Sequence, residues 1–326
     1  MRRLLAVALP AALALGNAGC VKGMMADGQI KATREAAPAV DTIGDYDVAR
    51  AAAQAGLAQF EGMHRLRPEN TDALLMLLKG WAGYGFAFAE DDYEDASLRE
   101  HEEEAEVHKA RAKHAYDRAI GYGLALLGQY DGGFAEAKKR EAPLKAWLAK
   151  NFRDKDDAEV LYWFGTAWML RVSLLKDDPA QVATLFVAPT FLERARKLDE
   201  GYNSYGAAMS LAAYHARNAA AELDESRAMF EDTLQKTGGH SLMVQLNYAT
   251  RYACIKRDRA LFDRMLGDIE KAADPDPSLE RGEAAKPEAR LRLMNTLAKR
   301  RARRAKTKAF LEECGFDTKN APSGHP

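Results

Sequence analysis

The most informative segment of the chain is Leu161-Tyr162-Trp163-Phe164-Gly165-Thr166-Ala167-Trp168-Met169-Leu170. An amphipathic surface helix carries a polar stripe on one side, and this segment has none. A helix that is apolar all round must be covered on several sides, so we expect it at the centre of a helical superhelix. Gly165 and Ala167 would allow neighbouring helices to approach closely.

The rest of the chain predicts one helix after another. No window shows the strict alternation of a half-buried strand, and turn residues such as Arg67-Pro68-Glu69-Asn70 separate the helical periods. We therefore predict an all-α fold, a TPR-like α-solenoid of antiparallel helix pairs. The expected helices cover residues 45–66, 72–90, 97–127, 134–151, 156–175, 179–198, 202–218, 222–236, 240–256, 258–272 and 287–313.

Composition excludes several classes of protein. The chain has 326 residues with 47% hydrophobic and 29% charged residues, which fits neither a disordered chain nor a multispanning membrane protein. Lys+Arg 47 against Asp+Glu 48 gives a formal charge of −1, so no chain-wide footprint for nucleic acid exists. The basic run at 299–306 is interpreted as a surface helix or a lipid-headgroup contact, because an exported protein rarely meets nucleic acid.

The N-terminus predicts export. Arg2 and Arg3 precede an apolar run from Leu4 to Leu15 that is too short to span a bilayer, and small residues follow up to Cys20. The Gly-Cys ending resembles a bacterial lipoprotein signal in which Cys20 is lipidated; ordinary secretion is the alternative. Val21 resembles the residue found in lipoproteins sent to the outer membrane. We expect a signal peptide at 1–19, a flexible tether at 20–44, a helical domain at 45–313 and a disordered tail at 314–326.

Two further cysteines, Cys254 and Cys314, leave two interpretations open. Cys254 lies in an apolar helical pattern, where a small buried thiol is expected. In an oxidising compartment the two cysteines could instead form a disulfide, whose geometry a sequence does not define.

A search for catalytic and metal-binding motifs gives negative results. Gly-x-Ser-x-Gly, a Walker loop, Cys-x-x-Cys and His-Glu-x-x-His are all absent from the sequence. Glu104 and His108 are spaced for a shared metal, yet the surrounding charges fit a solvated helix face. We predict a protein that is not an enzyme and that has no cofactor and no metal.

Aromatic residues recur along the helices and are candidates for the lining of a concave surface. Stacked helix pairs curve, and an aromatic lining would suit an apolar or amphipathic ligand. The alternative for each ring is an ordinary core position. The candidates are Trp81, Tyr84, Phe88, Tyr162, Trp163, Trp168, Tyr205, Tyr248 and Tyr252.

Several motifs occur in a fixed order along most of the chain. They are Leu57-x-x-Phe60-Glu61-Gly62-Met63, Tyr84-x-Phe86-Ala87-Phe88-Ala89-Glu90, Tyr116-x-Arg118-Ala119-Ile120-x-Tyr122-Gly123-Leu124, Asp157-Ala158-Glu159-Val160 leading into the segment from Leu161, Arg194-Ala195-x-x-Leu198-Asp199-Glu200-x-Tyr202, Arg227-Ala228-Met229-Phe230-Glu231 and Asp258-Arg259-x-Leu261-Phe262. Their order, together with the lipoprotein-like start, resembles the T-component family of TRAP transporters.

The resemblance implies a periplasmic, lipid-anchored protein of TPR-like fold. It also implies a TRAP solute-binding protein as partner, a homotrimeric assembly, and a channel in each subunit for a small hydrophobic ligand. The family has no catalytic signature to carry over. A TPR-like scaffold lipoprotein for envelope protein assembly, gripping peptide in its concave face, is the alternative function.

Overall fold

The computed structural model describes residues 23–217, 222–273 and 289–318, and within these ranges every regular element is a helix. The prediction of an all-α fold built from packed helix pairs is confirmed. Residues 1–22, which include the expected signal peptide and Cys20, lie outside the described residues. The α-helices are α2 (Tyr46–Leu66), α3 (Thr71–Tyr84), α4 (Glu90–Leu98), α5 (Glu102–Leu127), α6 (Phe134–Ala137), α7 (Glu141–Asn151), α8 (Asp157–Leu174), α9 (Pro179–Val182), α10 (Val187–Leu198), α11 (Tyr202–His215), α12 (Leu223–Lys236), α13 (Leu242–Asn247), α14 (Cys254–Lys256), α15 (Arg259–Lys271), α16 (Arg292–Ala305) and α17 (Lys308–Glu313).

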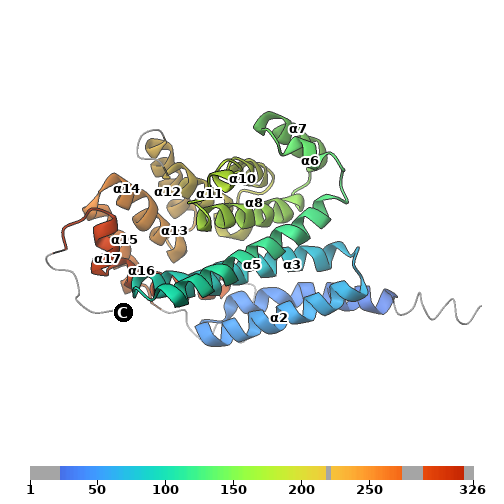
Figure 1. Ribbon diagram of the computed structural model, residues 1–326, viewed down its shortest axis with the longest axis horizontal. Helices are drawn as coiled ribbons and strands as arrows, with labels where there is room; N and C mark the ends of the chain where they lie inside the picture. The colour runs from blue at the N-terminus through green and yellow to red at the C-terminus, as the bar shows by residue number, and fades with distance from the viewer. Residues whose placement is uncertain (1–22, 218–221, 274–288, 319–326) are drawn as a thin grey trace, which may run out of the picture.

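Short turns with defined caps set the antiparallel pairing of consecutive helices. The carboxylate of Asp45 accepts hydrogen bonds from the backbone N–H groups of Asp47 and Val48 at the start of α2. Asn70 caps α3 in the same way through Ala73 N–H. Such caps satisfy N–H groups that have no partner within the helix, and they stabilise a helix by about 1 kcal/mol each. The chain then winds through α5, α8, α10, α11 and α12, each packed on the next (Figure 1).

Helix α8 contains the apolar segment and lies in the interior, as expected. It packs against α10, α5, α3 and α11, and the side chains of Leu161, Phe164 and Ala167 are fully buried. A Cβ atom at Gly165 would lie 3.0 Å from Phe191 Cβ and 3.1 Å from the Ala188 carbonyl oxygen. The glycine therefore permits the close contact between α8 and α10.

Two of the α-helices, α3 and α13, continue directly into π-helices. Helix α3 runs into the π-helix η2 (Gly85–Ala89) and then into α4, and α13 runs into the π-helix η3 (Tyr248–Ala253) and then into α14. The helix predicted over 97–127 begins instead at Glu102, because Ser97 and Leu98 complete α4. Such π-segments are rare in proteins and frequent at functional sites.

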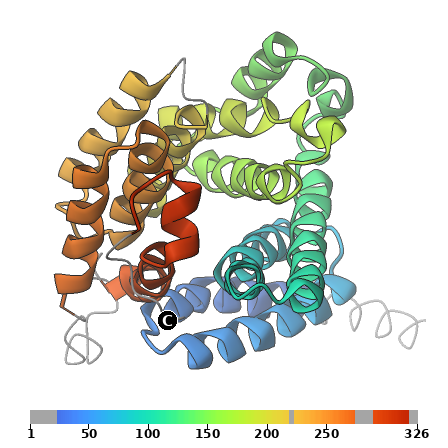
Figure 2. The same ribbon diagram turned by 60° about the vertical axis from the view of Figure 1, so that its left-hand side comes forward.

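The two ends of the helical array meet. Helix α16 packs against α2 and α4, and the 3-10 helix η5 (Ala289–Leu291) packs against the 3-10 helix η1 (Ala37–Thr42). Thr296 Oγ1 also donates a hydrogen bond to the Gly44 carbonyl oxygen at 2.9 Å. Figure 2 shows the resulting closed circuit, with α16 next to α2. The superhelix is therefore a ring rather than an open arc.

A buried cluster of charges holds this closure. Asp91 on α4 is fully buried and accepts hydrogen bonds from Arg304, from Arg300 and Arg301 at 3.3 Å each, and from the hydroxyl of Tyr46 at 2.9 Å. Burial alone would raise the pKa of Asp91, but the hydrogen bond from Arg304 and the three guanidinium charges lower it to about 2. Asp91 is therefore ionised at neutral pH, and its charge links α4 to α16.

The interpretation of the run at 299–306 as a surface or headgroup-binding helix is wrong for its central arginines. The side chains of Arg301 and Arg304 are 10% and 6% exposed, and both also pair with Glu94. Their counter-charges lie about 200 residues earlier in the chain, so no local pattern could show that this face of α16 turns inward.

The expectation of a flexible tether at 20–44 is also wrong for its described part. Residues 23–36 form a helix, and Ile30 is fully buried against Phe60, Met63 and Leu77. Arg34 pairs with Asp72 and, at 2.8 Å, with Glu159. Of the three large apolar residues in this segment only Ile30 is buried, while Met24 and Met25 are exposed, so the sequence shows no helical period that would predict a packed helix.

The C-terminal end is ordered further than expected. Cys314 forms a disulfide with Cys254, which resolves the alternative left open by the sequence. Phe316 is 9% exposed and packs edge-on against Phe262 at 5.0 Å between ring centroids. The expectation of a disordered tail at 314–326 is therefore wrong for residues 314–318, and residues 319–326 lie outside the described ranges.

We expect Asp91→Asn to lower the free energy of unfolding by about 3–5 kcal/mol, because it removes the fully buried counter-charge of Arg301 and Arg304 and leaves them only the partly exposed Glu94. Asp95→Asn, one turn further along α4, removes a half-exposed partner of Arg99 and should cost no more than about 1 kcal/mol. Urea denaturation of both variants measures the difference. Equal losses in the two variants would contradict a closure that depends on Asp91.

Candidate functional site

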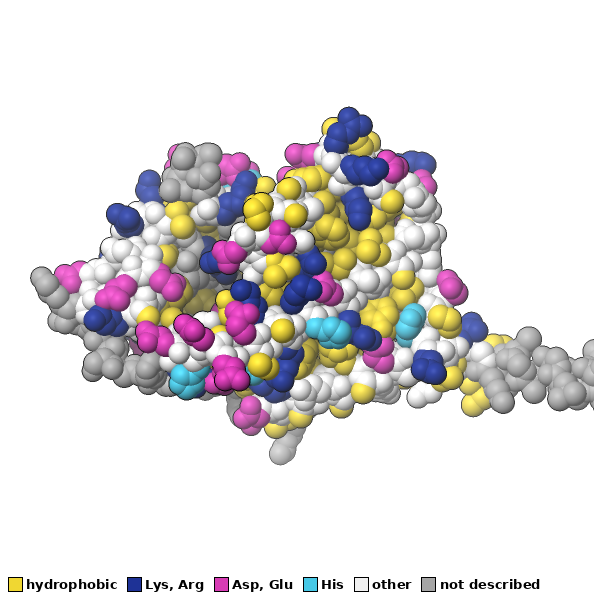
Figure 3. Space-filling model, in the orientation of Figure 1, with side chains coloured by type: hydrophobic (Ala, Val, Ile, Leu, Met, Phe, Trp, Pro, Cys, Tyr) yellow, Lys and Arg dark blue, Asp and Glu magenta, His cyan; other side chains and the backbone are white. Residues whose placement is uncertain are grey.

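The ring encloses a cavity of about 2250 Å³. Its walls are built by residues from η1, α2, α3, η2, α4, α8, α11, α13, η3 and α16, so nearly every layer of the superhelix contributes. Figure 3, drawn in the orientation of Figure 1, shows that the surface is hollowed, with hydrophobic side chains in the depth of the hollow. Typical small-molecule pockets measure about 300–1,000 Å³, so this cavity has room for a large or elongated ligand.

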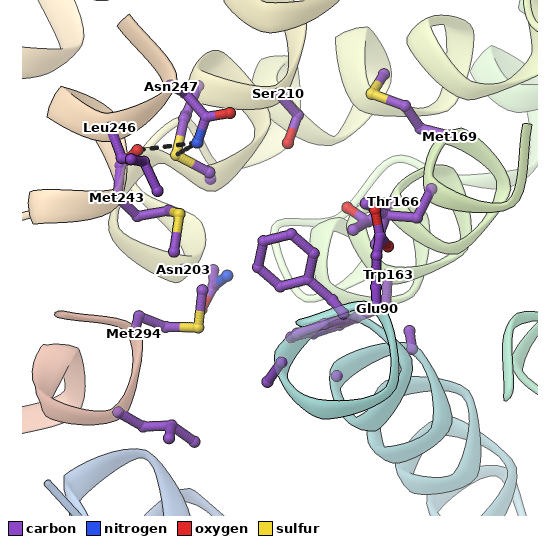
Figure 4. Close-up of a pocket in the computed structure, with 18 of the residues that line it drawn as sticks. Glu90, Trp163, Thr166, Met169, Asn203, Ser210, Met243, Leu246, Asn247 and Met294 are labelled. Atoms are coloured by element: carbon purple, nitrogen blue, oxygen red, sulfur yellow. Dashed lines mark hydrogen bonds between the residues drawn. The ribbon is translucent and has the colours of Figure 1, made fainter. Parts of the chain in front are cut away.

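Methionines are prominent in the lining. Met76, Met169, Met209, Met243 and Met294 come from five different helices and all line the cavity. Figure 4 shows Met169, Met243 and Met294 around the same space as Trp163 and Leu246. Methionine is unbranched and polarisable, and it adapts to apolar surfaces of irregular shape. The wall is suited to apolar ligands of variable outline.

The structure divides the nine aromatic candidates into two groups. Tyr84, Phe88, Tyr162, Trp163 and Tyr205 line the cavity. The other four do not and pack elsewhere, because each helix turns its rings toward more than one neighbour. Trp81 donates to Glu61 Oε1 at 2.8 Å, Trp168 donates to the Thr184 carbonyl oxygen at 3.2 Å, Tyr248 stacks on Phe230 with 5.0 Å between centroids, and Tyr252 is 4% exposed beside Tyr248.

A left-handed turn projects into the cavity at the start of α11. Asn203, Ser204 and Tyr205 have φ values of 50°, 54° and 62°, and all three line the cavity. Three consecutive non-glycine residues in this region are strained, and such strain concentrates at ligand sites. The amide of Asn203 donates to the Tyr162 hydroxyl at 2.9 Å. A Cβ at Gly206 would lie 2.7 Å from that hydroxyl oxygen, so only glycine permits this contact.

Comparison with protein-family models gives a match over residues 43–310 to the TRAP transporter T-component family. The match covers most of the chain. The chain belongs to this family. A search of curated proteins found no match.

Membership places this T-component in a TRAP transport system and in a cell-envelope context, and the family is one of transporter components rather than a known enzyme family. Across the described ranges, no helix has both the length and the apolar character needed to cross a bilayer. Within the same ranges, His, Cys, Asp and Glu nowhere gather in threes in a way that could hold a metal ion. The Glu104 carboxylate lies 3.2 Å from Nδ1 of His101, which precedes α5, and 3.7 Å from Nε2 of the half-buried His108 on α5.

Glu90 is one of the polar residues of this T-component's cavity that the sequence reasoning did not predict as a site. It follows the π-helix η2, is 8% exposed and accepts a hydrogen bond from the buried hydroxyl of Tyr116. Burial, with the nearby charge of Glu94, raises the pKa of Glu90 to about 7 against the opposing effects of Arg301, Tyr116 and Arg251. An acidic residue directly after the apolar run Phe86-Ala87-Phe88-Ala89 was the one available signal.

We expect the contribution of Glu90 to the free energy of unfolding of the T-component to fall as pH rises from about 4.5 to about 7. Its pKa is raised in the folded state, so the neutral form is favoured there and ionisation at higher pH disfavours folding. Glu90→Gln keeps an acceptor for Tyr116 and should flatten this part of the profile. Chemical denaturation between pH 5 and 8 measures it, and Glu106→Gln, an exposed residue of α5, should keep the wild-type profile.

Proposed function

We propose that this T-component is a non-catalytic accessory lipoprotein of its TRAP system that holds or channels a small hydrophobic ligand. The observation that carries the proposal is the large cavity whose wall is built mainly from methionine, aromatic and small side chains. Burial of apolar ligand surface contributes about 25 cal/mol per Å², so a cavity of this size can supply substantial affinity without many polar contacts.

Ring closure favours a small ligand over the alternative of a peptide-gripping scaffold. Scaffolds of stacked helix pairs bind extended partners on an open concave surface. Here α16 packs on α2 and α4, so the concave side of the array faces the inside of a ring, whose cavity opens to the surface as a hollow (Figure 3). An extended protein segment would need an open groove along the array.

The proposal includes a periplasmic TRAP solute-binding protein as partner, a homotrimeric assembly and a lipid anchor at Cys20. The family match and the lipoprotein-like start of the sequence support these three points. Val21 supports placement at the outer membrane. Native mass spectrometry of the protein from its own envelope tests the anchor and the assembly together, because the acyl mass and the oligomeric state are read from the same sample. A co-purifying lipid-like molecule in that sample would support the hydrophobic ligand.

Photocrosslinking in cells tests the partner. Recovery of a TRAP solute-binding protein is the expected result. Recovery of outer-membrane protein segments, with no solute-binding protein, would support the scaffold function instead.

We expect Gly83→Trp to weaken binding of the neutral dye Nile red at least tenfold. Gly83 on α3 lines the cavity, and nothing lies within 4 Å of a Cβ built there, so the indole would occupy ligand space rather than displace the wall. Gly121→Trp is the matched control, because Gly121 on α5 is exposed, has equally free space and lies outside the lining. Fluorescence titration measures both; equal binding by the two variants would exclude the cavity as the binding site.

A further inference from the structure

The three most exposed large apolar side chains of the described residues lie at one end of the molecule. Met24 and Met25 are 73% and 71% exposed in the first turn of the helix at 23–36, and Leu66 is 73% exposed at the end of α2. Single apolar side chains scattered over a surface are ordinary, whereas a group of them marks a contact surface. We call these three residues the apolar tip.

Hydrogen bonds hold the two parts of the apolar tip together. Arg67, directly after Leu66, donates two hydrogen bonds of 2.8 Å to the carboxylate of Asp27. A Cβ atom built at Gly23 would lie 3.3 Å from the guanidinium of the same arginine. The start of the helix at 23–36 is therefore fixed beside the turn between α2 and α3, at the right-hand end of the blue helices in Figure 1.

The charges beside the apolar tip balance one another. In the first two turns of the helix and in the turn after α2, the charged residues are Asp27, Arg65, Arg67 and Glu69, two of each sign. Since their formal charges cancel, attraction to a strongly charged partner is not what this surface offers. It offers flexible apolar side chains, which adapt to a partner without a fixed shape.

The apolar tip lies within a short distance of the proposed lipid anchor. Cys20 precedes Gly23 by three residues, and three residues span at most about 11 Å. The polar region of a bilayer is about 5–8 Å thick on each side. An acylated Cys20 therefore holds the start of the helix at 23–36 at or next to the lipid head groups.

We propose that the apolar tip is a membrane-docking surface, at which Met24, Met25 and Leu66 enter the head-group region of the bilayer that holds the acyl chains of Cys20. This inference rests on the lipid anchor in the proposed function and adds a second contact made by the folded domain. Apolar side chains that enter the boundary between head groups and acyl chains stabilise binding at a membrane surface. Two contacts fix the orientation of the T-component, with the turn between α2 and α3 facing the lipid.

The test measures the distance of individual sites from the lipid in the full acylated protein. Met25→Cys, Leu66→Cys and Val48→Cys are each labelled with the fluorophore NBD, since Cys254 and Cys314 form a disulfide and do not react. The proteins are reconstituted into vesicles of phosphatidylethanolamine and phosphatidylglycerol, with and without lipid that carries a doxyl quencher near the head group.

Val48 is the matched control site. It is 55% exposed and belongs to the same helix as Leu66, about 27 Å away along its axis. We expect the doxyl lipid to reduce the fluorescence of the labels at Met25 and Leu66 at least about twofold, because both lie at the head groups, and to leave the label at Val48 nearly unchanged.

A substitution tests whether the methionines help to hold the tip at the membrane. Met24→Asp should weaken the quenching of the label at Leu66, because a carboxylate is disfavoured next to the apolar part of the bilayer. Val48→Asp should not weaken it. Met24 and Val48 are both exposed, so neither change removes core packing, and circular dichroism checks that each variant is folded.

The label at Leu66 decides the result, because the label at Met25 follows the anchor closely whether or not the domain docks. Quenching at Met25 without quenching at Leu66 would overturn the docking surface and leave the lipid anchor standing. Equal quenching at Val48 and Leu66 would also overturn it. A mature chain whose mass includes no acyl groups would overturn the anchor and this inference together, whereas the hydrophobic-ligand function is tested separately by Gly83→Trp.

Discussion

The contact between Asp91 and the arginines of α16 is the constraint on which the rest of the molecule depends. Stacked helix pairs curve but do not close by themselves, since each pair needs only its neighbours. Here a fully buried carboxylate on α4 is paired with guanidinium groups from a helix more than 200 residues later. A buried charge without its partner is strongly disfavoured. The pairing of Asp91 with the arginines of α16 therefore stabilises the closed ring in the register that brings α4 and α16 together. Closure converts a concave face into a cavity.

The same cluster also determines the electrostatics of that cavity. Three arginines meet two carboxylates, and Arg301 and Arg304 line the cavity as well as holding the ring together. Glu90 and Asp91 are adjacent in sequence, yet their pKa values shift in opposite directions. Burial raises the pKa of Glu90, whereas the hydrogen bond from Arg304 and the arginine charges outweigh burial and lower the pKa of Asp91. One pair of acidic residues thus combines a structural anion with a carboxyl that changes charge near neutral pH.

The sequence predicts what is encoded locally. The all-apolar period of α8 indicated its central position, and capped turns such as the one at Asn70 indicated antiparallel pairs. Closure was not predictable, because Arg304 and Asp91 are far apart in sequence and a basic run is more often solvated. Aromatic rings such as Trp81 and Tyr248 were candidates by type, but which neighbour a ring faces depends on helix rotation, which one sequence does not define.

The cavity wall itself escapes motif analysis for a physical reason. Each helix contributes only a few side chains to the wall. The methionines that line it cannot be told from core methionines in the sequence, because both are apolar residues at helical spacing. What distinguishes lining from core is the fit between helices, as where Tyr162 contacts Gly206 and holds the left-handed turn through Asn203. A larger residue at position 206 would push α11 away from α8 and change the cavity without touching any ligand. The shape of the binding space is therefore encoded in the contacts between helices as much as in the residues that face it.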